Sequence, residues 1–395
     1  MNILRAQIKT ITFSALFAAI PLSAASALAV EDAAERLKSY SADQGLLLEW
    51  DNLNIKGNDV TLQGARAGVK ADEMTPIGDL ALEGISYDSK GYRIRTVSFS
   101  DYTHEDDDTT LTVQGVSMSN VLLPDDAVRA DYGDTIFYET ANIDEVTLTI
   151  DGKDVFGMSD TQFGMTEPEA DKAITFNGIV EAFSLDLSVI EDKQQLATLQ
   201  ALGYEQVAGS MEMAGSWNLG EGRMDLSQFD LTVDDAGTFG FTFDLGGYTP
   251  ALIASLREMS KQMATDDDDS NNTAQGLAIL GLLQQLSFHG AEIAFTDDSL
   301  TNKVLEYVAG NQGMKPKDVA NQAKAVAPFL LAQLKNPELT TQATQAISAF
   351  LDNPESLRIS AKPASPVPFA LLAATAMSTP TELTKSLAVS ISAND

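Results

Sequence analysis

The chain has 395 residues and no cysteine, and 57 acidic residues against 25 lysines and arginines give it a net charge of −32. Without thiols it has no disulfide, thiolate metal site or cysteine nucleophile, and the charge makes nucleic acids and anionic lipid surfaces poor partners. An apolar fraction of 44% is typical of globular proteins. We therefore expect a soluble, acidic chain of one or two domains.

Residues 1–29 have the pattern of a secretory signal peptide. Arg5 and Lys9 precede a short apolar run at 11–22, and an Ala-Leu-Ala sequence at 27–29 is typical of a cleavage site. We expect export to the periplasm, with secretion as the alternative. The longest later apolar runs, 277–283 and 367–377, are too short to span a bilayer and are expected to be buried. No integral membrane segment is therefore expected after cleavage.

Residues 30–188 are predicted to form a first domain, a helix followed by a β meander. Apolar residues at helical spacing predict the helix at 30–43. Short alternating runs from about residue 46 predict antiparallel strands with one buried face. Turn residues at 56–59 and 151–154 predict hairpins. His104, beside Glu105 and three aspartates, is expected in a charged turn between two strands.

Residues 189–395 are predicted to form a second domain that starts the same way. A helix at 189–202 precedes three strands at 207–219, 223–233 and 238–245, which hints at a duplication. Further strands are expected at 287–295, 357–361 and 387–392, and helices at 274–286, 300–309, 317–334 and 338–351. Asn-Pro-Glu sequences at 336–338 and 353–355 are typical of helix starts. The predicted class is α+β, with antiparallel β meanders and helices concentrated in the C-terminal third.

Catalytic and metal-binding patterns are absent from the sequence. The sequence has two histidines, His104 and His289, but no G-x-S-x-G elbow to present a serine nucleophile. It also has no P-loop, dinucleotide fingerprint or H-E-x-x-H sequence. The acidic runs at 106–108 and 266–269 lack the EF-hand spacing. We expect no catalytic residue, no cofactor and no metal ion. A hydrolase with a carboxylate pair stays open as the alternative, because such a pair is defined by spacing in the fold.

The strand predicted at 238–245 carries the most regular apolar face. Phe239, Phe241, Phe243 and Leu245 alternate with small or polar residues, so they lie on one side of the strand. One interpretation is an ordinary half-buried sheet face. The functional interpretation is an apolar sheet face that holds a lipid or acyl chain.

Three stretches between residues 185 and 395 carry a family resemblance. The first is the meander that begins with Leu-Gly-Tyr at 202–204 and ends with Leu-Gly-Gly-Tyr at 245–248. The second is Ala-Glu-Ile-Ala-Phe-Thr-Asp-Asp-Ser-Leu at 291–300. The third combines Leu-Arg-Ile at 357–359, the prolines at 363–368 and Leu-Ala-Val-Ser-Ile at 387–391. This half of the chain resembles uncharacterised exported AsmA-like and YdgA-like envelope proteins of Gram-negative bacteria. The resemblance implies a periplasmic, β-rich, non-enzymatic protein whose partner is a lipid or another envelope protein.

Overall fold

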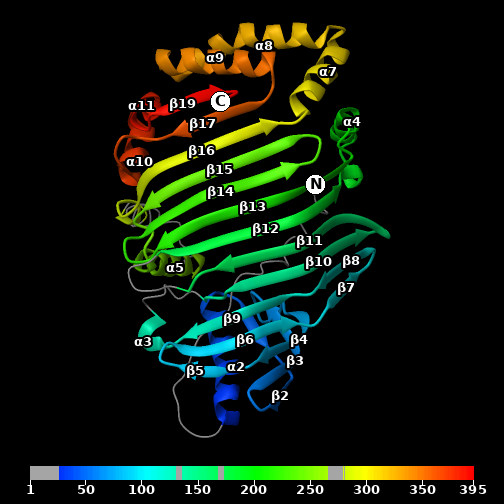
Figure 1. Ribbon diagram of the computed structural model, residues 1–395, viewed down its shortest axis with the longest axis vertical. Coiled ribbons are helices and arrows are strands. Elements are labelled where there is room, and N and C mark those ends of the chain that lie inside the picture. Colours follow the sequence, from blue (N-terminus) through cyan, green and yellow to red (C-terminus); the bar gives the residue numbers. More distant parts are fainter. Residues whose placement is uncertain (1–25, 130–135, 168–172, 266–278, 280) are drawn as a thin grey trace. The chain divides into compact units, whose positions relative to one another are not determined.

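The computed structural model describes residues 26–129, 136–167, 173–265, 279 and 281–395 (Figure 1). The chain divides into two compact units, unit 1 (Met1–Leu196) and unit 2 (Ala197–Asp395). The boundary predicted between residues 188 and 189 falls inside unit 1. Most of the predicted signal peptide lies outside the described residues, and residues 26–29 begin the first described helix.

Unit 1 is a helix followed by a long antiparallel meander, as the alternating pattern predicts. Its elements are α2 (Ser26–Asp43), β1 (Leu47–Glu49), β2 (Asn52–Lys56), β3 (Asp59–Gly68), β4 (Thr75–Glu83), β5 (Ser86–Asp88), β6 (Gly91–Phe99), β7 (Tyr102–Asp106), β8 (Thr109–Gln114), β9 (Ser117–Pro124), α3 (Asp126–Arg129), β10 (Thr140–Ile150), β11 (Lys153–Met165), β12 (Ile174–Asp186) and the short η3 (Leu187–Val189). The strands pair antiparallel, mostly with their neighbours in sequence. The hairpin predicted at 151–154 is confirmed: Asp151 and Gly152 both have positive φ, as a type I′ turn requires.

The core of unit 1 lies between α2 and one face of this sheet. Ala33, Ala34 and Leu37 on the helix are fully buried. They meet buried residues of β3, β4, β6 and β9, among them Leu62 and Ile94. The apolar face of these strands is thus filled by a helix of the same unit.

A buried arginine lies on the same helix. The Arg36 guanidinium donates to both carboxylate oxygens of Asp126, at 2.8 and 3.1 Å, and Asp125 lies 3.9 Å away. Burying a cation is tolerated only with such partners, so this contact fixes the start of α3 against α2.

The prediction for His104 is wrong. His104 lies within β7, opposite Leu111 of β8, and the turn follows at Asp107, which has positive φ. Among the described strands β7 pairs only with β8. Its charged side chains therefore suit an edge strand, where they discourage further pairing.

Unit 2 combines a second meander with helices. After α4 (Lys193–Leu202), which crosses the boundary, its elements are β13 (Gln206–Asn218), β14 (Arg223–Val233), β15 (Gly237–Gly246), α5 (Pro250–Thr265), β16 (Ser287–Asp297), α7 (Leu300–Gln312), α8 (Pro316–Leu331), η5 (Ala332–Leu334), α9 (Pro337–Asp352), β17 (Ser356–Ala361), β18 (Val367–Pro368), α10 (Phe369–Ser378), η6 (Pro380–Glu382), α11 (Leu383–Ser386) and β19 (Val389–Ala393). Strands β13, β14, β15, β16, β17 and β19 follow one another in an antiparallel sheet, and β18 pairs with the start of β16. The protein is mostly antiparallel sheet with helices toward the C-terminus, as predicted.

Three local predictions in or beside unit 2 need correction or restriction. The helix predicted from residue 189 begins at Lys193, because the Asp192 carboxylate accepts the N–H groups of Gln194 and Gln195 and caps it there. Asn336 caps α9 as expected, through the Leu339 N–H at 3.2 Å, but Asn353 ends α9 and is followed by β17. The helix predicted at 274–286 lies partly outside the described residues; within them, residues 279 and 281–283 are helical and 284–286 are not. Ile279, in the apolar run expected to be buried, is 37% exposed.

The apolar run at 367–377 is not a buried element. It contains α10, on which the side chains of Leu371 and Met377 are 56% and 88% exposed. Within the part of the chain that the structure describes, no helix combines the length and apolar character needed to cross a bilayer.

The packing of α2 predicts a large effect of a core truncation. Leu37→Ala leaves a cavity among fully buried side chains, so we expect it to lower the free energy of unfolding of unit 1 by about 2–5 kcal/mol. Urea denaturation followed by circular dichroism measures the loss. Ser39→Ala, at an exposed position of the same helix, is the control and should change little. Equal effects of the two substitutions would contradict the role of α2 as the core of unit 1.

Candidate functional site

The four residues singled out on β15 belong to an apolar face that crosses the sheet of unit 2. Residues paired across antiparallel strands point to the same side of a sheet, so the register defines rows of side chains. Three neighbouring rows, which we call the apolar face, contain only apolar residues: Met211, Leu231, Phe239, Phe295, Leu357 and Ala393; then Phe241, Ile293, Ile359 and Ile391; then Leu226, Phe243, Ala291, Ala361 and Val389. Leu245 extends the face, opposite Met224 and Phe288.

The centre of the apolar face is open to solvent. Phe239, Ile293 and Ile359, on three adjacent strands, are 42%, 44% and 42% exposed. The equivalent inward-facing residues of unit 1, such as Leu62 and Ile94, are fully buried beneath α2. The described part of unit 2 therefore leaves partly exposed the kind of surface that unit 1 buries.

Helices contact the ends of the apolar face rather than its centre. The ring of Phe350 on α9 lies 6.4 Å from that of Phe295, and the ring of Phe369 on α10 lies 6.4 Å from that of Phe288. The inner side of α9, with Leu339, Ala343 and Ala346, is buried, and α9 packs on β17 and β19. These contacts hold the strands in place while Ile293 and Ile359 stay accessible.

One glycine allows β15 to lie close to β16. Gly237 has φ of +148°, and a Cβ at this position would lie 2.3 Å from the Thr296 carbonyl oxygen. Only glycine fits this approach and this backbone conformation. It begins the strand in the register that pairs Phe239 with Phe295 and Phe241 with Ile293.

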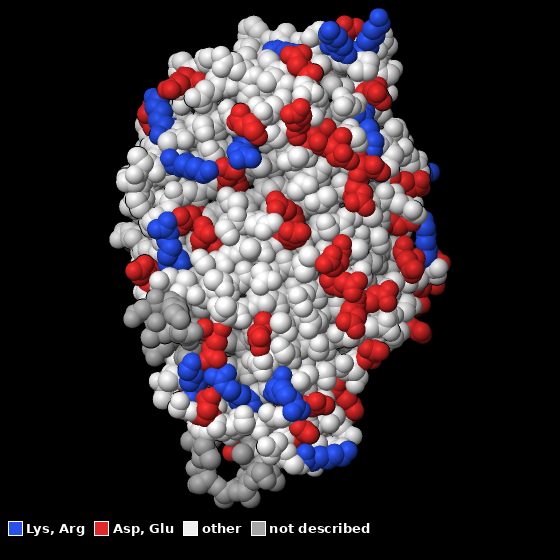
Figure 2. Space-filling model, viewed as in Figure 1, with Lys and Arg blue, Asp and Glu red and all other residues white. Residues whose placement is uncertain are grey.

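The opposite face of the same sheet is polar and charged. Glu292 accepts from Lys362 at 2.7 Å and pairs with Arg358 at 3.3 Å, and the hydroxyls of Thr232 and Thr238 lie 2.9 Å apart. Figure 2 shows acidic side chains distributed over this side of the strands. The contrast between the two faces sets the orientation of every strand in the sheet.

Two aspartates face each other on the polar face. Asp225 of β14 is directly opposite Asp244 of β15, and the Arg223 guanidinium donates two hydrogen bonds to Asp244. Burial and the neighbouring Asp244 carboxylate raise the pKa of Asp225. Both acids line a surface hollow of about 350 Å³, together with His289 and Lys362. Two neighbouring acids, one of which has a raised pKa, form an arrangement that is used in general acid–base chemistry.

The acidic runs do not assemble into a metal site in the part of the structure described. No group of three or more His, Asp or Glu residues there has a geometry that could hold a metal ion. Asp106 ends β7, and residues 266–269 lie outside the described residues. A second hollow of about 490 Å³ is lined by Asp234, Asp235, Asp297 and Asp298, and the Lys303 ammonium donates to the Asp235 carbonyl at 2.9 Å beside it.

Sequence reasoning found one strand of the apolar face and missed the others. Phe239, Phe241, Phe243 and Leu245 share a face as predicted, and their role in binding stays a prediction. Ile293 was expected to be buried in the strand at 287–295 but is 44% exposed, and neither it nor Ile359 was assigned to this face, although both lie in alternating segments. Only the register shows that they are neighbours of Phe241.

Comparison with known proteins adds a family match without a function. The sequence model of a family described as "Uncharacterized protein" matches residues 230–394. This segment includes β15, β16, β17 and β19, and therefore most of the apolar face. A search of curated proteins found no match.

The raised pKa of Asp225 predicts a pH-dependent effect on stability. Because the folded state favours the protonated acid, its contribution to stability is fully present below the ordinary value of 3.8 and is lost as the pH rises through the raised pKa of the folded state. We expect Asp225→Asn to raise the melting temperature at neutral pH and to leave it unchanged at a pH below 3.8. Thermal melts at both pH values test this, with Asp234→Asn in the exposed turn as the control. An increase of the same size at both pH values would contradict it.

Proposed function

We propose that this is a non-enzymatic binding protein of the bacterial cell envelope, and that unit 2 holds a lipid acyl chain on its apolar face. The observation that carries the proposal is the partial exposure of Phe239, Ile293 and Ile359 at the centre of three wholly apolar rows. Soluble proteins seldom leave a continuous apolar surface uncovered unless it binds something.

The chemistry of the face favours an acyl chain over a polar ligand. No charged side chain belongs to the three rows, so a polar ligand placed there would lose hydration without gaining partners. An alkyl chain gains about 0.8 kcal/mol for each CH₂ group that it buries. Neither of the hollows described above includes Phe239, Ile293 or Ile359 in its lining, so the ligand would lie on an open face and exchange readily.

The proposed location is the periplasm, with secretion as the alternative. It is supported by the signal-peptide pattern at residues 1–29 and by the resemblance to AsmA-like and YdgA-like envelope proteins. We propose no cofactor. The order of a helix before a meander, seen at α2 with β1 to β12 and at α4 with β13 to β15, supports a duplicated origin of the two units.

Native mass spectrometry of the protein purified from its own periplasm is the direct test. A phospholipid or fatty acid retained at fixed stoichiometry would support the proposal, and extraction would identify it. A protein that carries no lipid and takes up none from an envelope extract would contradict it. Co-purification of a stoichiometric protein on the same face would favour an envelope-protein partner instead.

Substitutions on the two faces of the sheet locate the ligand. We expect Phe239→Asp or Ile359→Asp to weaken binding of a fluorescent fatty acid by at least about tenfold, since each places a charge on the apolar face. Both positions are more than 40% exposed, so folding should survive. The control is Ser390→Asp, at an exposed position of β19 whose hydroxyl lies 2.8 Å from that of Ser360 on the polar face. A loss as large for the control would place the ligand elsewhere.

A secreted hydrolase with a carboxylate pair is the second candidate, because Asp225 and Asp244 face each other and the pKa of Asp225 is raised. Its test is hydrolysis of a panel of chromogenic glycosides by the wild-type protein and by Asp225→Asn and Asp244→Asn. Activity lost in both variants would support this candidate. Activity that is absent from the wild type on every substrate, or unchanged in both variants, would contradict it.

A further inference from the structure

Helix α8 exposes an apolar strip on the side that faces solvent. Val326, Phe329 and Leu330 are 44%, 78% and 61% exposed. Their i, i+3, i+4 spacing places them together on one side of the helix. The opposite side, with Ala320 and Ala327, is buried, and α8 packs between α7 and α9. The strip is therefore not part of the packing within unit 2.

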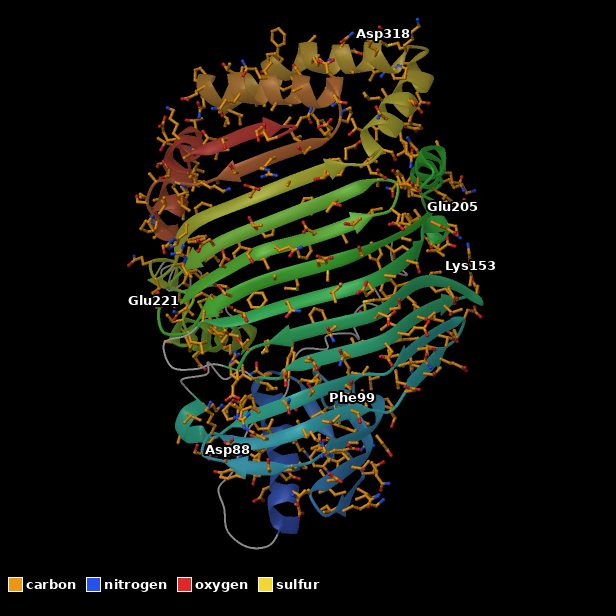
Figure 3. The ribbon with its side chains drawn as sticks, viewed as in Figure 1. Asp88, Phe99, Lys153, Glu205, Glu221 and Asp318 are labelled. Carbon is orange, nitrogen blue, oxygen red and sulfur yellow. The ribbon has the colours of Figure 1, made fainter. Side chains whose placement is uncertain are left out.

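The segment that carries this strip has a net charge opposite in sign to that of the whole protein. Residues 314–335 contain four lysines and one acid, a local charge of +3, whereas the chain carries −32. Lys324 is paired with Asp352. In the described part of the chain, no ion pair involves Lys315 and Lys317 at the start of α8 or Lys335 after its end. Figure 2 shows basic side chains beside this helix. Asp318 lies in its first turn (Figure 3), where the helix dipole favours an acid.

We propose that α8 docks the protein on an anionic lipid surface. An amphipathic helix with aromatic and aliphatic residues on one side and lysines around them lies in the membrane interface, with its apolar side at the boundary between headgroups and acyl chains. Phe329, Leu330 and Val326 would enter this boundary. Lys315, Lys317 and Lys335 would contact lipid phosphates, each contributing about 1 kcal/mol near an anionic surface.

The large negative charge of the chain does not prevent this contact. At physiological ionic strength, charges are screened over about 8 Å. The interaction of a membrane with the tip of unit 2 is therefore set by the residues near α8, while acids farther away contribute little. This surface differs from the apolar face in its residues, so the proposal does not depend on the one above.

A second exposed apolar helix provides a contrast. Leu371 on α10 is 56% exposed, close to the value for Leu330, but α10 contains no lysine or arginine. Exposure alone therefore does not distinguish the two helices. The lysines of this segment distinguish it from α10. In a symmetric contact between two copies they would face one another and repel, so they favour an anionic lipid surface over a dimer formed through two α8 strips.

Vesicle flotation tests the proposal with the full chain. We expect binding to phosphatidylcholine vesicles that contain phosphatidylglycerol, little binding to pure phosphatidylcholine, and release by high salt. Phe329→Asp or Leu330→Asp should lower the partition coefficient by at least about tenfold. Each of Lys315→Gln, Lys317→Gln and Lys335→Gln should lower it about fivefold. Leu371→Asp, the matched control, should bind vesicles like the wild type.

Several results would overturn it. Equal binding to both kinds of vesicle, or no binding to either, would rule out the lysine contacts. An equal loss for Leu371→Asp would show unspecific adsorption of exposed apolar residues. Sedimentation analysis that detects a dimer lost in Phe329→Asp would assign α8 to a contact between copies of the chain. Because Phe329 and Leu330 are largely exposed, their variants should fold, and circular dichroism verifies this.

Discussion

Antiparallel register is the constraint on which the rest of the structure depends. Paired residues point to the same side of a sheet. Strands that alternate between apolar and polar residues therefore form a continuous apolar face only when their register aligns the apolar residues of neighbouring strands. In unit 2 this holds from β13 to β19, so Phe241, Ile293, Ile359 and Ile391 form one row although the outer two are 150 positions apart in sequence. A shift of one residue in any strand would place a charged or polar side chain in the apolar rows. The ion pairs of Glu292 and Asp244 on the other side reinforce the same register.

The two units use this pattern in different ways. In unit 1 the apolar side of the sheet is closed by α2, whose Ala33 and Ala34 allow the helix to approach the strands closely. In unit 2 the aromatic contacts of Phe350 and Phe369 support the ends of the face and leave partly exposed residues between them. The same sheet architecture thus forms a hydrophobic core in one unit and a partly exposed apolar face in the other.

Much of the fold could be predicted from the sequence, because strands and their turns leave a local signal. Alternation located β14 and β15, and the Asp-Gly pair at 151–152 located a hairpin whose backbone it suits. The errors arose where tertiary context decides. His104 lies in a strand because β8 pairs with it, and Asn353 is followed by β17 because β16 and β19 are beside that segment. The apolar face was predicted on β15 alone, since the rows depend on partners distant in sequence. Asp225 and Asp244 likewise lie opposite each other because of the strand register, which the composition does not show.

The position of α2 has a consequence for how unit 1 reaches its folded state. This helix is the first described element, and its packing partners extend to Val121 and Leu123 on β9. Contacts so far apart in sequence close large loops and slow the folding of a chain. As the chain emerges from a ribosome, α2 can pack first on β1, β2 and β3, which follow it directly, but its core is complete only when β9 is available. During that interval the helix can bind a chaperone. The length of the interval depends on how soon the later strands are synthesised, not on how the helix packs in the folded unit.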